Sequence, residues 1–166
     1  DIPQGMQALV FNMTNPILKD PNVREALIYA MDFEWLNKHL FYSQYTRTRS
    51  YFQNSEYEAR GLPSQKELEY LEPIKDKVPP RVFTEEYKPP VTDGSGNIRA
   101  QMRAAMKILK SSGWEIKDKK MMHIETGKPL EFELLLYSPT MERIVIPIQN
   151  NLNKMGITMN IRRVDT

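Results

Sequence analysis

The C-terminal part of the chain has the order strand, helix, strand, and this order restricts the fold more than any other feature. Leu130 to Leu136 and Ile157 to Val164 are segments of strand length in which apolar residues recur. Between them Met141 to Met155 has helical periodicity, and we expect Pro147 to kink this helix and Gly156 to end it. Two strands joined in this way pair in parallel through a right-handed crossover. We therefore expect an α/β or α+β domain, with one mixed sheet and covering helices.

A strand and two short helices are expected near the N-terminus. Gln7 to Phe11 is a short apolar run typical of a buried strand. Asp20 followed by Pro21 predicts a helix start, and apolar residues follow at helical spacing: Val23, Ala26, Leu27 and Ala30. Asp32 is expected to cap a second helix that runs to Phe41.

The middle of the chain has weaker periodicity. Tyr42 to Pro63 is aromatic, hydroxylated and basic, and we expect an ordered surface loop there. Ser64 and Glu67 form a capping-box pattern for a short helix that carries Leu68 and Leu71. The prolines that follow are expected to prevent regular structure: Pro73, Pro79, Pro80, Pro89 and Pro90.

Two further elements precede the C-terminal pattern. The turn Asp93 to Asn97 leads into an amphipathic helix that should end at Gly113, with one apolar face: Ile98, Met102, Ala105, Met106 and Leu109. Met121 to Ile124 and Leu130 to Leu136 flank Gly127, a pattern that predicts an antiparallel hairpin.

Composition excludes several classes of protein. A chain of 166 residues with 40% hydrophobic residues can bury the core of one domain. No apolar run approaches the roughly 20 residues of a spanning helix. The formal charge of +2 does not favour nucleic-acid binding. The absence of cysteine excludes a disulfide scaffold, a thiolate metal site and a cysteine nucleophile.

Catalytic and metal motifs give little support to an enzyme. His39 and His123 are the two histidines, and they lie in different elements without the spacing of a zinc site or triad. The turn from Asp93 to Gly96 lacks the further residues of a calcium or phosphate loop. We therefore expect no catalytic residue, no metal site and no cofactor.

Two segments are candidates for ligand binding. The segment from Tyr45 to Phe52 alternates arginines with aromatic and hydroxyl side chains, which can pair with carboxylates and stack on apolar groups. A surface loop with locally packed aromatics explains it equally well. The segment from Tyr137 to Arg143 follows a strand and begins a helix, where open α/β sheets bind ligands. The alternative there is a plain connection with Glu142 and Arg143 in solvent.

Several motifs in succession resemble family 5 bacterial extracellular solute-binding proteins. Phe11-Asn12, the segment Asp20 to Leu27 with Ala30, and Asp32 to Trp35 resemble the start of the third domain of that family, which serves oligopeptide, dipeptide and nickel importers. A further set resembles the Yej-type members, associated with uptake of oligopeptides and of the peptide-nucleotide antibiotic microcin C: Leu40-Phe41-Tyr42, Tyr45-x-Arg47, Ser50-x-Phe52, Asn54-Ser55-Glu56, Gly61 to Ser64, Asp93 to Gly96, Gly113-Trp114 and Arg162 to Asp165. The resemblance extends over essentially all 166 residues.

The resemblance implies one lobe of a type II periplasmic-binding-protein-like fold. Such a receptor has two lobes that close about a hinge on an oligopeptide, and it docks on the permease subunits of an ABC transporter in the periplasm. Residues 1–166 are then a single domain and part of the C-terminal lobe. The signal peptide, the other lobe and the acidic residue that holds the ligand's amino terminus are expected outside this chain. Neither nucleic acid nor membrane insertion is expected.

The same resemblance assigns a set of residues to the wall of the ligand cleft: Asn12, Tyr45, Arg47, Arg49, Tyr137, Thr140 and Glu142. Three other interpretations stay open. A nickel or haem receptor of the same fold is a related one, and a peptidase or amide hydrolase domain belongs to a different class. The third is a structural scaffold that docks on another chain through its proline-rich middle.

Overall fold

The computed structural model describes residues 6–164, which form two compact units. The smaller unit comprises residues 6–9 and Thr46–Pro89. The larger unit comprises Val10–Tyr45 and residues 90–164. The larger unit is therefore discontinuous in sequence, with the segment from Thr46 to Pro89 inserted between its two parts.

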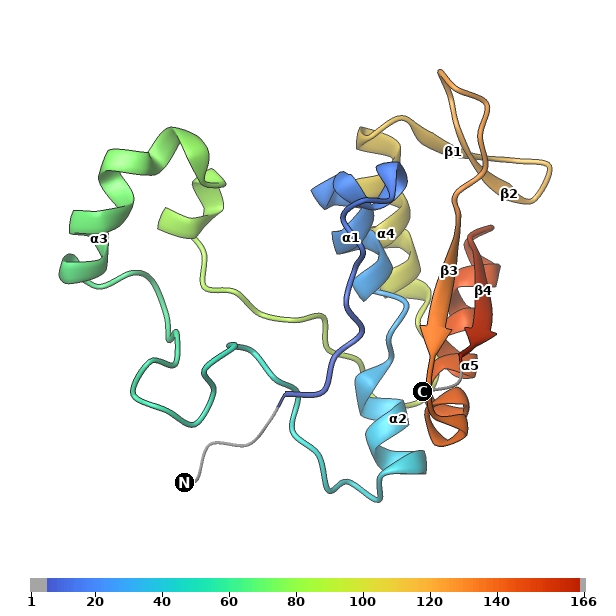
Figure 1. Ribbon diagram of the computed structural model, residues 1–166, viewed down its shortest axis with the longest axis horizontal. Helices are drawn as coiled ribbons and strands as arrows, with labels where there is room; N and C mark the ends of the chain where they lie inside the picture. Colours follow the sequence, from blue (N-terminus) through green and yellow to red (C-terminus); the bar gives the residue numbers. More distant parts are fainter. Residues whose placement is uncertain (1–5, 165–166) are drawn as a thin grey trace. The chain divides into compact units, whose positions relative to one another are not determined.

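The larger unit contains every strand of the described chain (Figure 1). Its elements are, in order, the 3₁₀ helix η1 (Pro16–Lys19), α1 (Pro21–Ile28), α2 (Phe33–Leu40), α4 (Arg99–Ser111), β1 (Trp114–Lys117), β2 (Lys120–His123), β3 (Glu131–Leu136), α5 (Pro139–Lys154) and β4 (Thr158–Arg163). The smaller unit holds α3 (Gln65–Leu71) and the 3₁₀ helices η2 (Glu72–Lys77) and η3 (Pro80–Phe83). None of the described helices is long and apolar enough to cross a membrane.

The predicted starts of α1 and α2 are confirmed, because side-chain caps define both. Asp20 accepts a hydrogen bond from the amide of Asn22 at 2.8 Å, and Pro21 occupies the first turn. Asp32 accepts one from the amide of Trp35 at 3.1 Å. The apolar residues predicted for α1 and the turn after it are buried: Val23, Ala26, Leu27 and Ala30.

The capping box of α3 is confirmed on both sides. The amide of Glu67 donates to the Ser64 hydroxyl, and the amide and hydroxyl of Ser64 each donate to Glu67 Oε2 at 2.7 Å. These bonds favour the ionised carboxyl, and the Ser64 hydroxyl makes the largest contribution, so the pKa of Glu67 lies below its ordinary value.

We expect acid to open this capping box only below the ordinary pKa of a glutamate. A folded pKa that is lowered contributes stability above the unfolded value of about 4.3, and the contribution is lost as pH falls through the folded pKa. In an NMR titration the amide of Ser64 should therefore shift with a midpoint below about 4.3. Glu67→Gln keeps the box without a titrating group, so its Ser64 amide should stay nearly constant. A midpoint at or above the ordinary value would contradict the assignment.

The prolines after α3 do not abolish regular structure as expected. Pro73 and Pro80 each lie in the first turn of a 3₁₀ helix, η2 and η3 respectively. Proline fits there because its missing N–H belongs to the unpaired donors of a helix start. Between Pro73 and Pro90 the chain therefore has 3₁₀ helices but neither an α-helix nor a strand.

The parallel strand–helix–strand unit is confirmed. β3 and β4 pair in parallel over their full lengths, from Glu131 opposite Thr158 to Leu136 opposite Arg163, and α5 connects them. Pro147 lies inside α5, and Gly156 follows its end with φ of +74°. Gln149 Nε2 donates to the carbonyl of Met159 at 2.7 Å and links α5 to β4.

The strands form two separate two-stranded sheets rather than one mixed sheet. β2 pairs antiparallel with β1, not with the strand after Gly127. Residues 118 and 119 connect β1 and β2 with positive φ of 51° and 65°, which is the geometry of a tight hairpin turn. Beyond Gly127 the hairpin reduces to one bridge, Met122 with Pro129, because the chain then leaves to pair with β4.

The predicted N-terminal strand is wrong for the described residues. Residues 6–10 are exposed and belong to no strand, although the run is apolar. A strand needs a partner for its N–H and C=O groups, and no described residue pairs with this segment. Hydrophobicity alone was therefore a poor guide here.

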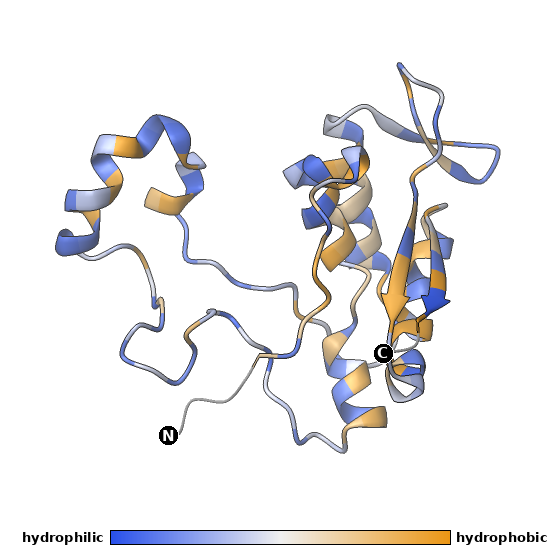
Figure 2. Ribbon diagram, viewed as in Figure 1, coloured by the Kyte–Doolittle hydropathy of each residue, from blue (hydrophilic) through white to orange (hydrophobic). Residues whose placement is uncertain are grey.

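The core lies where α1, α4 and α5 meet the strands. Its fully buried members include Val23, Ala105, Leu109, Leu130 and Leu152. Asn22 Nδ2 donates to Ser112 Oγ at 2.8 Å and links α1 to the end of α4. Figure 2 shows β3 as mostly hydrophobic, in agreement with its inward residues, whereas the segment 46–60 is mainly hydrophilic.

Candidate ligand-binding site

The carboxyl ends of β3 and β4 lie side by side, because the two strands are parallel and end in register. Leu136 is opposite Arg163, and the amide of Val164 donates to the carbonyl of Leu136 at 2.9 Å. The first turn of α5 begins at the same edge, three residues after β3 ends. The topology therefore places the segment 137–142 next to the end of β4.

An ion pair links α5 to β4 at this edge. Glu142 Oε2 lies 2.6 Å from Arg163 Nη2, and Glu142 is partly buried. Glu142 is thus paired with Arg163 rather than free in solvent, which differs from the solvated side chain of the plain-connection alternative, and ligand contact by Glu142 stays a prediction. Arg143 is exposed, as that alternative expected. The edge presents a cation and an anion together, beside the positive end of the α5 dipole.

Tyr137 and Thr140 are the other predicted residues at this edge. Both are exposed, and 73% of Tyr137 is accessible. An exposed tyrosine beside a charged pair can stack on apolar ligand groups and donate a hydrogen bond. The structure therefore brings Tyr137, Thr140 and Glu142 to one edge, and Arg163 joins them. Arg163 was absent from the predicted set, although the parallel register would have placed it there.

Asn12 and Tyr45 also belong to the larger unit, and local contacts hold both. The Asn12 side-chain oxygen accepts from the amide and the hydroxyl of Thr14, at 3.0 and 2.8 Å. Asn37 holds the backbone of Tyr45 on both sides: its Nδ2 donates to the carbonyl at 2.8 Å, and its Oδ1 accepts from the amide at 3.0 Å. The Tyr45 ring packs on Phe41 with centroids 4.6 Å apart. The Asn12 carboxamide oxygen is thus engaged within its own turn.

Arg47 and Arg49 lie in the smaller unit. Arg47 is partly buried and Arg49 is exposed, while the Arg49 amide donates to Gln53 Oε1 at 2.8 Å. The hydrogen bond from the Asn54 amide is the largest cause of a lowered pKa at Glu58, and the positive charge of Arg49 makes the smallest contribution. Ligand contact by these arginines stays a prediction.

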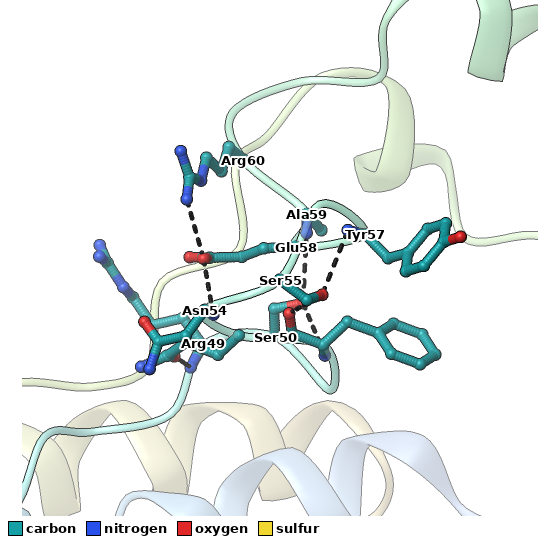
Figure 3. A network of polar contacts seen from close by, with 10 residues as sticks. Arg49, Ser50, Asn54, Ser55, Tyr57, Glu58, Ala59 and Arg60 are labelled. Atoms are coloured by element: carbon teal, nitrogen blue, oxygen red, sulfur yellow. Dashed lines mark hydrogen bonds and ion pairs between the residues drawn. The ribbon is translucent and has the colours of Figure 1, made fainter. Parts of the chain in front are cut away.

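The loop after Arg49 is ordered by its own hydrogen bonds, as expected (Figure 3). Ser50 Oγ accepts from the amides of Phe52 and Ala59, and Glu58 Oε2 accepts from the Asn54 amide at 3.0 Å and from Arg60 at 3.1 Å. Phe52 and Tyr57 pack edge to face with centroids 6.2 Å apart. This supports the interpretation of locally packed aromatics without deciding between it and a binding role.

The histidines have ordinary aromatic neighbours. His39 packs on Trp35 with centroids 4.8 Å apart, and His123 contacts Trp114 edge to face at 4.9 Å. The amide of Thr126 lies 3.4 Å from His123 Nδ1, within hydrogen-bond reach of it. In the described part of the chain no three His, Cys, Asp or Glu residues gather in a way that could hold a metal ion.

The family model for bacterial extracellular solute-binding proteins, family 5 Middle, matches residues 1–166. The chain belongs to the family 5 bacterial extracellular solute-binding proteins. It is 46% identical over 162 residues to the uncharacterized protein YejA of Escherichia coli (strain K12). The aligned residues make up 98% of this chain and 27% of that protein. It is 44% identical over 160 residues to the probable peptide-binding protein YejA of Agrobacterium fabrum, covering 96% of this chain and 26% of that protein. The chain therefore spans about a quarter of the length of these relatives.

Another relative in Agrobacterium fabrum, the peptidoglycan-binding protein YepA, is 39% identical over 165 residues, covering 99% of this chain and 27% of that protein. Two solved structures show the fold. NikZ from Campylobacter jejuni in complex with Ni(L-His) has a TM-score of 0.64 at 22% identity, over 94% of this chain and 25% of that one. AppA from Bacillus subtilis in complex with a nonapeptide has a TM-score of 0.61 at 20% identity, over 93% of this chain and 25% of that one. The expected fold class, one lobe of a type II periplasmic-binding-protein-like fold, is confirmed.

Proposed function

We propose that this chain forms part of the peptide-binding lobe of an extracytoplasmic receptor that delivers oligopeptides to an ABC transporter. The observation that carries the proposal is the 44% identity, across 96% of the chain, to a probable peptide-binding protein. Family 5 members are solute-binding proteins, so no catalysis is proposed. The receptor is taken to act in the periplasm and to dock on permease subunits.

The edge at the carboxyl ends of β3 and β4 supports this function chemically. Arg163 can pair with a peptide carboxylate, and Glu142 can pair with a peptide ammonium group. Tyr137 and Thr140 add an aromatic surface and a hydroxyl without forming a deep pocket. Such an arrangement suits ligands bound through their backbone and charged ends, with tolerance for varied side chains. We propose that residues 1–166 act as a single domain within the C-terminal lobe.

Calorimetric titration with a mixed pool of tri- to hexapeptides tests the function. We would titrate the pool into a receptor of full family length that carries this chain, and into the 166-residue chain alone. Saturable heat from the first with little or none from the second is expected, because the chain covers about a quarter of its relatives. Silence from both proteins would overturn the proposal.

The ligand class can be narrowed in the same experiment. A fraction of peptides released from peptidoglycan is included because of the similarity to YepA. Microcin C is included because of the Yej-type resemblance, and Ni(L-His) tests the nickel receptor of the same fold. Heat from Ni(L-His) with none from any peptide would replace the peptide function by metal-complex binding.

Tyr137→Ala should weaken peptide binding by the full-length receptor about tenfold, in the range of an aromatic contact residue. Protein stability should change little, because Tyr137 is 73% exposed. The matched control is Tyr70→Ala on α3, where the tyrosine is 79% exposed but lies far in sequence from the proposed edge. Calorimetry on both variants checks the prediction. Equal affinities for the two variants would remove Tyr137 from the site.

A further inference from the structure

The smaller unit has helices but no core of its own. No residue from 6 to 9 or from 46 to 88 is buried, and α3, η2 and η3 each lack a buried side chain. The larger unit, by contrast, buries a cluster of apolar side chains. A folded segment must bury apolar surface to offset the conformational entropy that it loses. The smaller unit therefore depends on contacts that its own side chains do not supply.

The usual substitutes for a core are also missing from this unit. Units well below about 70 residues are commonly held by disulfides or by a structural metal. The chain has no cysteine, and among the described residues no group of three metal-binding side chains could hold a metal ion. Hydrogen bonds such as those at Ser50 and Glu58 fix the local shape of the loop, but each adds little net stability in water. A partner that packs on the unit is the remaining source of stability.

The smaller unit carries neighbouring aromatic side chains on its surface. Tyr51, Phe52 and Tyr57 are exposed, and Phe52 and Tyr57 pack on each other edge to face. In Figure 3 the Tyr57 ring points away from the polar contacts that order the loop. Single exposed aromatics are normal, but a group of them in contact marks a surface that another protein segment covers.

An open hollow of about 480 Å³ lies against these rings. It is lined by the two packed aromatics and by three acids: Phe52, Tyr57, Glu56, Glu58 and Glu67. Glu58 is paired with Arg60, and Glu67 accepts from Ser64, whereas the Glu56 carboxylate has no such partner among the described residues. Carboxylates beside aromatic faces attract a basic side chain from both sides. The lining therefore indicates the chemistry of the covering segment as well as its apolar character.

We propose that the polypeptide of the same receptor outside residues 1–166 covers this surface and places an arginine or lysine side chain in the hollow. The relatives described above have room for such a segment, because the chain spans about a quarter of their length. A permanent cover fits better than a transient peptide ligand, because a unit without a core needs its apolar surface covered throughout. The proposal rests on family membership and not on the identity of the ligand.

Charge argues against a membrane as the cover. The segment from Thr46 to Pro89 has eight basic and eight acidic residues, so its net charge is zero. An anionic lipid surface attracts segments with a clear excess of lysine and arginine. A protein surface with apolar side chains and a single basic group suits a segment without net charge better.

Hydrogen–deuterium exchange tests the proposal on the 166-residue chain and on a receptor of full family length, both without ligand. We expect residues 46–88 to exchange at least tenfold faster in the chain alone, because the covering segment is missing there. The helix α4, which carries the buried Ala105 and Leu109, should exchange slowly in both proteins and is the internal control.

Three results would overturn the proposal. The first is equal exchange of residues 46–88 in the two proteins, whether fast or slow, since slow exchange in both would place the cover within the chain itself. The second is protection of the receptor only after a peptide is added, which would make the ligand the cover. The third is protection of the isolated chain that rises with its concentration, which would make a second copy the cover.

Substitutions at the hollow make the test specific. In the full-length receptor Phe52→Ala should speed exchange in residues 46–88 about tenfold, as for an aromatic contact residue, whereas Tyr87→Ala should change it little. Both side chains are 61% exposed, and Tyr87 does not line the hollow. Glu56→Gln should speed exchange about threefold through loss of an ion pair, with Glu69→Gln on α3 as its matched control. If either substitution acted no more strongly than its control, the hollow would not be the contact.

Discussion

Gly156→Ala is expected to lower the free energy of unfolding by about 2–4 kcal/mol, among the largest effects of any single methyl group in this chain. Gly156 has φ of +74°, which alanine adopts at a cost of about 1–2 kcal/mol. An added Cβ would also lie 2.8 Å from the amide nitrogen of Met121 and 2.9 Å from the carbonyl oxygen of Lys119. Both contacts are backbone atoms, so neither can rotate away. The change also disturbs the bond from the Met121 amide to the Gly156 carbonyl, at 2.8 Å.

Urea unfolding followed by tryptophan fluorescence measures this effect, since both tryptophans lie in the larger unit. Gly127→Ala is the matched control. Gly127 has φ of +63°, but an added Cβ there has nothing within 4 Å. Only the backbone term then applies, and the loss should be about 1 kcal/mol. Equal losses at the two glycines would show that the packing of Gly156 on β2 does not contribute.

The helices could be predicted because their signals are local. Asp20, Asp32 and Ser64 each cap a helix with their own side chain, and the bond reaches only two or three residues along the chain. Gly113 and Gly156 end helices through positive φ, which is again a property of one residue. Such features are visible in a sequence without knowledge of the fold.

Strand pairing could not be predicted in the same way, since it depends on distant partners. Trp114 to Lys117 alternates apolar and polar residues, but only the folded chain shows that this strand takes β2 as its partner. Gln7 to Phe11 has a strand composition and no partner among the described residues. Whether an apolar run is buried therefore depends on the rest of the fold and not on the run alone.

The candidate site followed from topology more than from residue type. A parallel pair of strands with a connecting helix places the end of β3 beside the end of β4, which explains why Tyr137, Thr140 and Glu142 share an edge. The partner of Glu142 was missed because Arg163 is 21 residues away and its register was unknown before the strands were paired.

Leu130 connects the two sheets through its backbone, and a substitution at this position is expected to have a large effect on stability. Its amide donates to the carbonyl of Met121 in β2 at 2.8 Å, and its carbonyl accepts from the amide of Thr158 in β4 at 3.1 Å. Its side chain is fully buried in the core. Leu135, five residues further along, is 52% exposed on the opposite face of β3.

Leu130→Ala should therefore lower the free energy of unfolding by about 2–5 kcal/mol, because a buried leucine is removed and the rigid junction of two sheets cannot collapse to fill the space. Leu135→Ala changes the same atoms on the exposed face and should cost less than about 1 kcal/mol. Urea unfolding of both variants, with equal m-values, isolates the effect of burial from that of residue type. If both variants lost similar stability, the face of β3 assigned to the core would be wrong. A large loss at Leu130 alone would show that the burial of this side chain in the core, rather than its residue type, sets the effect.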